Sequence, residues 1–290
     1  MPRPALVTLM LIILALPSSL PAADNLAALE ALAAASARVQ PGLQNYLATV
    51  ETSRIAEMMA GMTSGMPADV KPPPAPVITK FWQRDGRGLV FARQTQLSPY
   101  VEKMVKQLSA NLAIELNEML LPAAQVERRR ELTAGATVKS TEVALADTLL
   151  RRLEIAFEKP TDLDGAFYVS GLRLPQKQIT RLVFDLDTKT NTVSELLIAS
   201  VEAPPLTVEI RYLAVQGGHI PQRFTITSPD GTIDDLFDVT FTEVAGYRLP
   251  ASMLRVIHRP ELDERLEVFF KNYQVNKPVP DDIKMRLGGQ

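Results

Sequence analysis

An acidic cluster in the last quarter of the chain is dense enough to suggest calcium binding. It consists of Asp230, Asp234, Asp235 and Asp238. Calcium takes carboxylate oxygens as ligands, and the EF-hand loop supplies them at fixed spacings that this cluster does not reproduce. The same stretch alternates apolar and polar residues like a β-strand, so neighbouring aspartates should point to opposite faces of a sheet. We therefore expect no metal site here.

A second acidic pair, Asp185 and Asp187, lies between Phe184 and Thr188. The run is similar to the opening motif of haloacid-dehalogenase phosphotransferases. In that motif a strand leads into a helix, and a threonine occupies the place that Lys189 takes here. A hairpin is expected to follow instead, so the pair does not predict phosphoryl transfer.

The histidines offer little for catalysis. His219 lies in a Gly-Gly turn and His258 near the end of a predicted strand, and neither has the neighbours that a metal site or a catalytic triad requires. The chain contains no GxSxG, HExxH or P-loop motif. We expect no catalytic residue, no cofactor and no metal. An enzyme would have only the acidic groups in its favour.

Composition narrows the function classes further. The chain has 290 residues, of which 46% are hydrophobic and 22% charged, and its net charge is −2. Such a chain can bury a large core in one large domain or two small ones. Basic residues are balanced by acidic ones, so we expect no nucleic-acid partner. The absence of cysteine excludes disulfides and a lipidated thiol.

Residues 1–23 have the pattern of a signal peptide. Arg3 supplies the positive charge, an apolar run covers residues 5–16, and Ala22 and Ala23 are small residues suited to cleavage. The run is shorter than the roughly 20 residues that a membrane-spanning helix needs, although an uncleaved anchor is the alternative. We expect an exported monomer, processed near Ala23, whose remaining residues 24–290 form a single domain.

Residues 224–283 organise the predicted fold. Turns at Pro229 to Gly231, at Ala245-Gly246 and at Pro260-Glu261 separate apolar runs, which is typical of hairpins in succession. In the last run one face is apolar, with Leu266, Val268 and Phe270. Such a meander has one side that must be covered.

Two stretches of this region resemble the outer-membrane lipoprotein-sorting proteins of the LolA/LolB-like superfamily. They are Phe241 to Pro250, with its Gly246-Tyr247 turn and Leu249-Pro250, and the ending from Asn272 to Ile283. The resemblance covers the earlier chain only in its architecture. It implies a periplasmic carrier from a Gram-negative bacterium that shields acyl chains and performs no catalysis.

Helical spacing predicts what covers the sheet. We expect helices over residues 24–39, 98–122 and 123–132, and a further helix over residues 141–152 that runs into a strand. A strand over 43–55, a hairpin over 77–94 and strands from Gln178 onward complete the pattern. The predicted fold is α+β, a strongly curved, incompletely closed antiparallel barrel with helices covering its concave side.

A Met- and Pro-rich segment, residues 58–76, is predicted to be a long flexible loop. Met58, Met59, Met62 and Met66 alternate with glycines, and prolines follow. Methionine moulds to variable partners, so the segment suits the mouth of an acyl-binding cavity. The alternatives are a mobile hairpin tip whose methionines pack on the body and, less in keeping with the spacing, copper binding.

The expected function is a periplasmic carrier of lipid or lipoprotein acyl chains, working with inner- or outer-membrane transport partners. The cavity-lining candidates come from the Met-rich segment, from one of two hairpin aromatics on opposite faces, and from the apolar stripe of the long helix: Met58, Met59, Met62, Phe81, Trp82, Val101, Met104, Val105, Leu108 and Leu112. The basic cluster Arg128 to Arg130 could meet a lipid head group or an acidic partner, or be a solvated helix face. The alternative function is a structural or sensory module that binds a protein partner through the same sheet.

Overall fold

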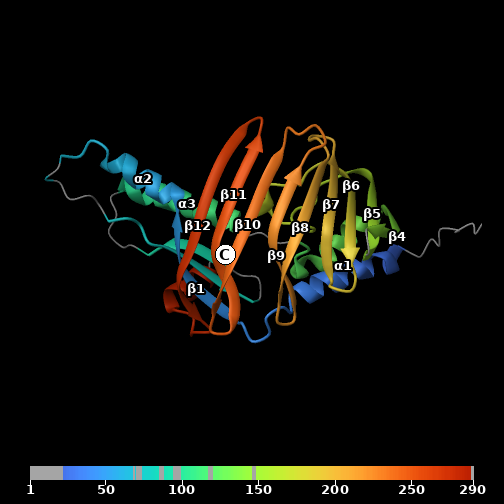
Figure 1. The fold of residues 1–290 in the computed structure, drawn as a ribbon, viewed down its shortest axis with the longest axis horizontal. Helices are drawn as coiled ribbons and strands as arrows, with labels where there is room; N and C mark the ends of the chain where they lie inside the picture. Colours follow the sequence, from blue (N-terminus) through green and yellow to red (C-terminus); the bar gives the residue numbers. More distant parts are fainter. Residues whose placement is uncertain are drawn as a thin grey trace, which may run out of the picture.

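A computed structural model describes residues 22–67, 69, 74–84, 88–93, 99–116, 120–145 and 148–288. The predicted signal peptide lies almost wholly outside this part of the chain. The described strands form one antiparallel sheet in the order β3-β2-β1-β12-β11-β10-β9-β8-β7-β6-β5-β4. Strands β3 and β4 are its two edges, so the sheet curves without closing into a barrel (Figure 1).

Hairpins connect most neighbouring strands, which is why the sheet order follows the sequence order from β12 back to β4. The strands are β1 Asn45–Thr52, β2 Ile78–Gln83, β3 Gly88–Ala92, β4 Ala136–Leu145, β5 Thr148–Thr161, β6 Ile179–Asp187, β7 Thr192–Ser200, β8 Leu206–Val215, β9 Gly218–Thr227, β10 Asp234–Val244, β11 Tyr247–Arg259 and β12 Leu262–Val275.

Five helices and two short 3-10 turns accompany the described strands. They are α1 Ala22–Ser36, α2 Ser53–Thr63, α3 Pro99–Glu115, α4 Val126–Thr133 and α5 Asp281–Gly288, with η1 Ala123–Gln125 and η2 Ser170–Leu172. The predictions of α1, α3 and α4 are confirmed. The C-terminal helix α5 was not predicted.

The helix predicted over residues 141–152 was wrong. This stretch is divided between β4 and β5, which pair from Ala136 opposite Phe157 to Leu145 opposite Thr148. Apolar residues three or four positions apart match helical spacing even when they lie on two successive strands. The β-branched residues of the stretch, such as Val138 and Val143, favour the strand conformation that is found.

The turns predicted in the C-terminal region are confirmed. Ala245 and Gly246 have φ angles of 52° and 82° between β10 and β11, as a tight hairpin turn requires. Pro260 and Glu261 separate β11 from β12.

A β-bulge in β12 sets the direction of its last residues. The pairing with β1 shifts between Leu47, which lies opposite Gln274, and Thr49, which lies opposite Lys271. Asn272 has a φ of 53°, and asparagine tolerates this left-handed conformation better than most residues. The extra residue lets Phe270 and Tyr273 both pack against the same apolar cluster, which simple alternation would not allow.

One half of the concave side is a sealed core. Helix α1 and residues 163–174 pack on β4 to β10, and the central side chains, such as Leu153, Phe184 and Phe224, are fully or almost fully buried. Figure 1 shows α1 lying along this half of the sheet. Tyr168 is held in the core by its hydroxyl, which donates to the carbonyl oxygen of Pro175 at 2.5 Å.

The convex side carries a smaller apolar layer beneath α5. Ile283 and Leu287 of this helix pack against Leu47, Phe81 and Phe91. Within the described residues, no helix combines the length and apolar character that crossing a membrane would demand.

Candidate functional site

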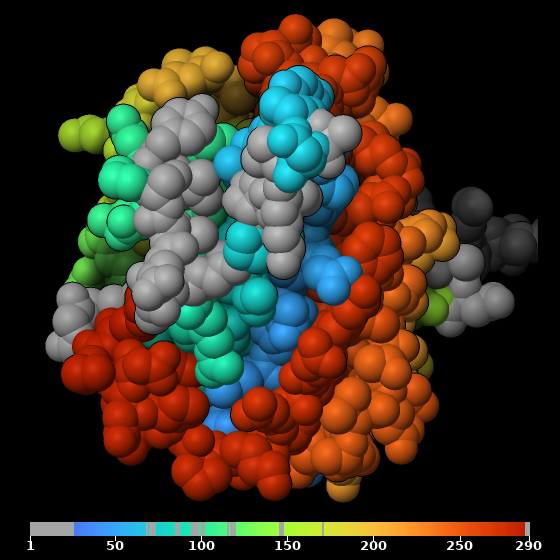
Figure 2. All heavy atoms as spheres, turned by 90° about the vertical axis from the view of Figure 1, so that its left-hand side faces the viewer, coloured from blue at the N-terminus to red at the C-terminus, as the bar shows by residue number. Residues whose placement is uncertain are grey.

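The other half of the concave side lies under α2 and α3 and is less completely buried. Among the described residues, its apolar cluster has 14 buried members and 11 that are only partly buried, against 28 and 6 in the sealed half. Strands β1, β2, β11 and β12 form its floor. Figure 2 views this end of the molecule, where β11 and β12, in red, curve around β1, in blue, and α2, in cyan, projects toward the viewer.

Helix α3 covers the floor through the apolar stripe that the sequence predicted. Val105 and Leu112 are buried against the sheet, whereas Leu108 is only partly buried. Met104 is half-buried, and the side chain of Val101 lies outside the described part of the structure. At the end of this helix, Nζ of Lys80 on β2 donates to the carbonyl oxygen of Leu116 at 3.1 Å.

Helix α2 occupies the beginning of the segment predicted to be a loop. The prediction was wrong for residues 58–63, which are helical despite Gly61. Thr52 caps the helix by accepting from the N–H of Ile55 at 3.2 Å, and this cap stabilises the start of a weak helix-former. Met59 and Met62 pack against the apolar cluster, and Met58 is half-buried. Residues 68 and 70–73 of the segment lie outside the described residues.

The two hairpin aromatics face opposite sides, as predicted. Trp82 lies on the concave side and stacks on Tyr46 with 5.4 Å between ring centroids, and Tyr273 meets Tyr46 edge-on at 5.6 Å. Burial raises the pKa of both tyrosine hydroxyls well above the ordinary value. Phe81 is buried beneath α5 on the convex side, so its candidacy as a cavity-lining residue was wrong.

Charged side chains close one end of the concave side. Glu264 on β12 forms ion pairs with Arg54 of α2, with Arg173 at 4.0 Å and with Arg255 of β11 at 3.4 Å. Arg255 is completely buried and stacks over the ring of Phe237. The sequence analysis missed this group, although strand alternation places Glu264 and Arg255 on the apolar face of their strands.

The acidic residues weighed from the sequence have structural partners. Asp185 receives two hydrogen bonds from Arg152 at 2.6 and 2.7 Å, and Asp230 accepts from Ser228 and Thr232 within its turn. The strand separates the remaining aspartates, as predicted: Asp235 is buried with Arg259 on the concave side, and Asp238 pairs with Arg223 at 2.9 Å. No group of three or more potential metal ligands lies together among the described residues.

The basic cluster of α4 is engaged within the protein. Arg129 is 1% exposed and binds Glu30 of α1 as well as the carbonyl oxygens of Pro122 and Ala166. Arg128 pairs with Asp164 and Glu131, and Arg130 with Glu127. These contacts favour the structural interpretation of the cluster over a head-group site.

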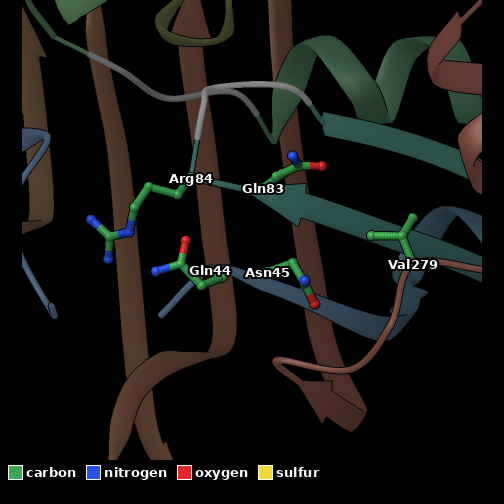
Figure 3. A pocket seen from close by; sticks show the side chains of 5 residues that line it. All are labelled: Gln44, Asn45, Gln83, Arg84 and Val279. Atoms are coloured by element: carbon green, nitrogen blue, oxygen red, sulfur yellow. The ribbon is translucent and has the colours of Figure 1, made fainter. Parts of the chain in front are cut away.

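A surface pocket of about 310 Å³ lies where β1 and β2 end. Gln44, Asn45, Gln83, Arg84 and Val279 line it (Figure 3). The guanidinium of Arg84 points away from Val279 in Figure 3. It donates to the carbonyl oxygens of four residues, Ala37, Val39, Gln40 and Leu43, at 2.6–3.1 Å. Its role is therefore to hold the segment between α1 and β1, and the pocket has no charge to offer a ligand.

Comparisons with known proteins add a fold-level likeness. No family model matches the chain, and no curated protein matches it. Three solved structures are similar. One is a putative outer membrane lipoprotein-sorting protein domain from Vibrio parahaemolyticus, 9% identical, covering 92% of this chain and 99% of that one, with a TM-score of 0.35.

The second is a DUF1329 family protein from Desulfovibrio piger, 8% identical, covering 90% and 95% of the two chains, with a TM-score of 0.38. The third is a LolA superfamily protein from Nitrosomonas europaea, 8% identical, covering 88% and 96%, with a TM-score of 0.31. The superfamily that the C-terminal motifs resemble is thus also represented among similar structures. These scores carry no assignment of site residues, which rests on the geometry above.

Proposed function

We propose that the protein is an exported, non-catalytic carrier that binds the acyl chains of a lipid or lipoprotein. The chains would lie between helices α2 and α3 and the concave face of β1, β2, β11 and β12. The observation that carries the proposal is the difference between the two halves of the concave side. One half is a sealed core, and the other is apolar but only partly buried.

The two covering helices differ in how firmly they are held. Helix α3 buries Val105 and Leu112 against the sheet, so it forms a stable wall. Helix α2 buries only Ile55 completely and contacts the floor through partly buried methionines. A helix held by few buried side chains can move at lower cost than one that forms part of the core. We assign α2 the role of the moving cover.

The binding free energy would come from burying methylene groups. Each buried methylene contributes about 0.8 kcal/mol, which corresponds to roughly fourfold in affinity. Affinity should therefore rise with chain length until the space under α2 is filled. The test is displacement of a fluorescent fatty-acyl probe by saturated fatty acids of increasing length.

Two substitutions on the same helix make this test specific for the site. Leu108→Glu places a charge among the lining residues and should abolish probe binding, because burying an unpaired carboxylate is costly. Ile114→Glu is the matched control, since Ile114 is 52% exposed and its replacement should leave binding unchanged. If Leu108→Glu fails to fold, Met59→Gln tests the lining from α2. Equal binding by the wild type and the folded lining variants would contradict the proposal.

A further inference from the structure

A buried serine lies in the middle of the apolar stripe of α3. Ser109 is 6% exposed. It follows Val105 by four residues and precedes Leu112 by three, so it lies on the helix face that these two residues bury against the sheet. Across the described part of the chain, its hydroxyl has no hydrogen-bond partner.

An unpaired hydroxyl in such a place is unfavourable for the empty protein. A serine in a helix can donate to the carbonyl oxygen four residues earlier, but this bond is not formed here. Burying a polar group without a partner costs free energy, and the large majority of buried polar atoms have one. The position would be better filled by alanine, unless the hydroxyl meets a partner in the bound state.

The surroundings limit what that partner can be. The floor beneath this part of α3 is apolar, with buried side chains such as Val50, Val268 and Phe270 in the same cluster as Val105 and Leu112. A hydrocarbon chain lying there offers no hydrogen-bond acceptor, whereas the ester carbonyl at the head of an acyl chain does. Its neutral oxygen can accept from a hydroxyl without bringing a charge into the apolar region.

We propose that Ser109 is a specificity residue that donates a hydrogen bond to the ester carbonyl of a bound acyl lipid. This inference rests on the proposed function and extends it, because it names ester-linked lipids as the preferred ligands. The hydroxyl would fix where the chain begins, and methylene burial would supply most of the affinity.

The experiment compares two ligands in two proteins. A lysophospholipid with an ester-linked chain and its ether-linked analogue, equal in chain length and head group, compete with the fluorescent fatty-acyl probe. The wild type should bind the ester about 2- to 12-fold more tightly, the range expected for one hydrogen bond. Ser109→Ala should bind both lipids equally, with the ether affinity unchanged. Ser64→Ala, which removes an exposed hydroxyl at the end of α2, should keep the ester preference.

The outcomes separate this inference from the carrier proposal. Binding of both lipids with the same ester-to-ether ratio in the wild type and in Ser109→Ala would overturn the role of Ser109 and leave the carrier proposal standing. Failure of the wild type to bind either lipid or the probe would overturn both. A second measurement needs no ligand: Ser109→Ala should unfold at an equal or higher denaturant concentration, and a clear loss of stability would show instead a structural role for the hydroxyl.

Discussion

Arg54, in the first turn of helix α2, forms an ion pair with Glu264 on strand β12. The contact joins the helix that we propose to move to the strand that forms the floor beneath it. Glu264 also binds Arg255, which is completely buried. The carboxylate is therefore held in place whether or not α2 stays closed, and Arg54 is the partner that can leave.

Replacing Arg54 with methionine should make α2 open more readily. The side chain keeps its apolar length but loses the ion pair, and a partly exposed pair is worth up to about 1 kcal/mol. We expect the acyl probe to dissociate roughly two- to fivefold faster, with little change in the free energy of unfolding. Stopped-flow displacement measures the rate.

Arg265→Met is the control for this prediction, because Arg265 is an exposed arginine of the same strand that pairs with Glu267. An unchanged dissociation rate in Arg54→Met would show that the ion pair does not restrain the cover.

Arg129 should matter for stability and not for binding. It is buried in the other half of the molecule, where it joins α4 to Glu30 of α1 and to two carbonyl oxygens. Arg129→Met would leave these acceptors without their donor and should lower the free energy of unfolding by about 3 kcal/mol. Urea denaturation tests this, with the exposed Arg130→Met as control, expected to change stability by less than about 0.5 kcal/mol. A large effect on probe affinity in a folded Arg129→Met protein would argue against two separate halves.

Glu195 should make stability fall with rising pH. It lies between Asp185 and Glu209 on neighbouring strands. Its pKa is raised above the ordinary 4.5, first by burial and then by the nearby Asp185 carboxylate. Because the folded protein holds this proton more tightly than the unfolded chain, the destabilisation develops as the pH rises from about 4.5 through the folded-state pKa.

Glu195→Gln should therefore be more stable than the wild type at pH 7 and lose that advantage below pH 4. Denaturation at the two pH values measures the difference. Glu202→Gln is the control, since Glu202 is exposed. The same stability difference at both pH values would mean that Glu195 does not titrate as described.

The C-terminal sheet could be predicted from the sequence because its signals are local. Asp230-Gly231 and Ala245-Gly246 mark turns by their backbone freedom, and the alternation of Leu266, Val268 and Phe270 identifies the buried face. The β4–β5 hairpin could not, because the spacing of its leucines fits a helix equally well and only pairing with β6 decides the matter. Tertiary context overrides local preference in such cases.

The site was predicted only in part, for a similar reason. The apolar stripe of α3 was visible as a period, and Trp82 and Phe81 were correctly placed on opposite faces. Which of the two faces the concave side depends on α5, a helix whose position no local pattern reveals. The partners of Glu264 come from three distant parts of the chain, so the group emerges only from the fold.

The central claim is that the partly buried half of the concave side holds an acyl chain. The most direct measurement is mass spectrometry of organic extracts from the protein purified without detergent from its native source. The carrier proposal predicts an acyl-containing lipid or lipoprotein fragment at close to one per protein, and its loss in a folded Leu108→Glu variant. A lipid-free protein that also fails to take up the fluorescent probe would contradict the proposal and turn attention to a protein partner, sought by cross-linking.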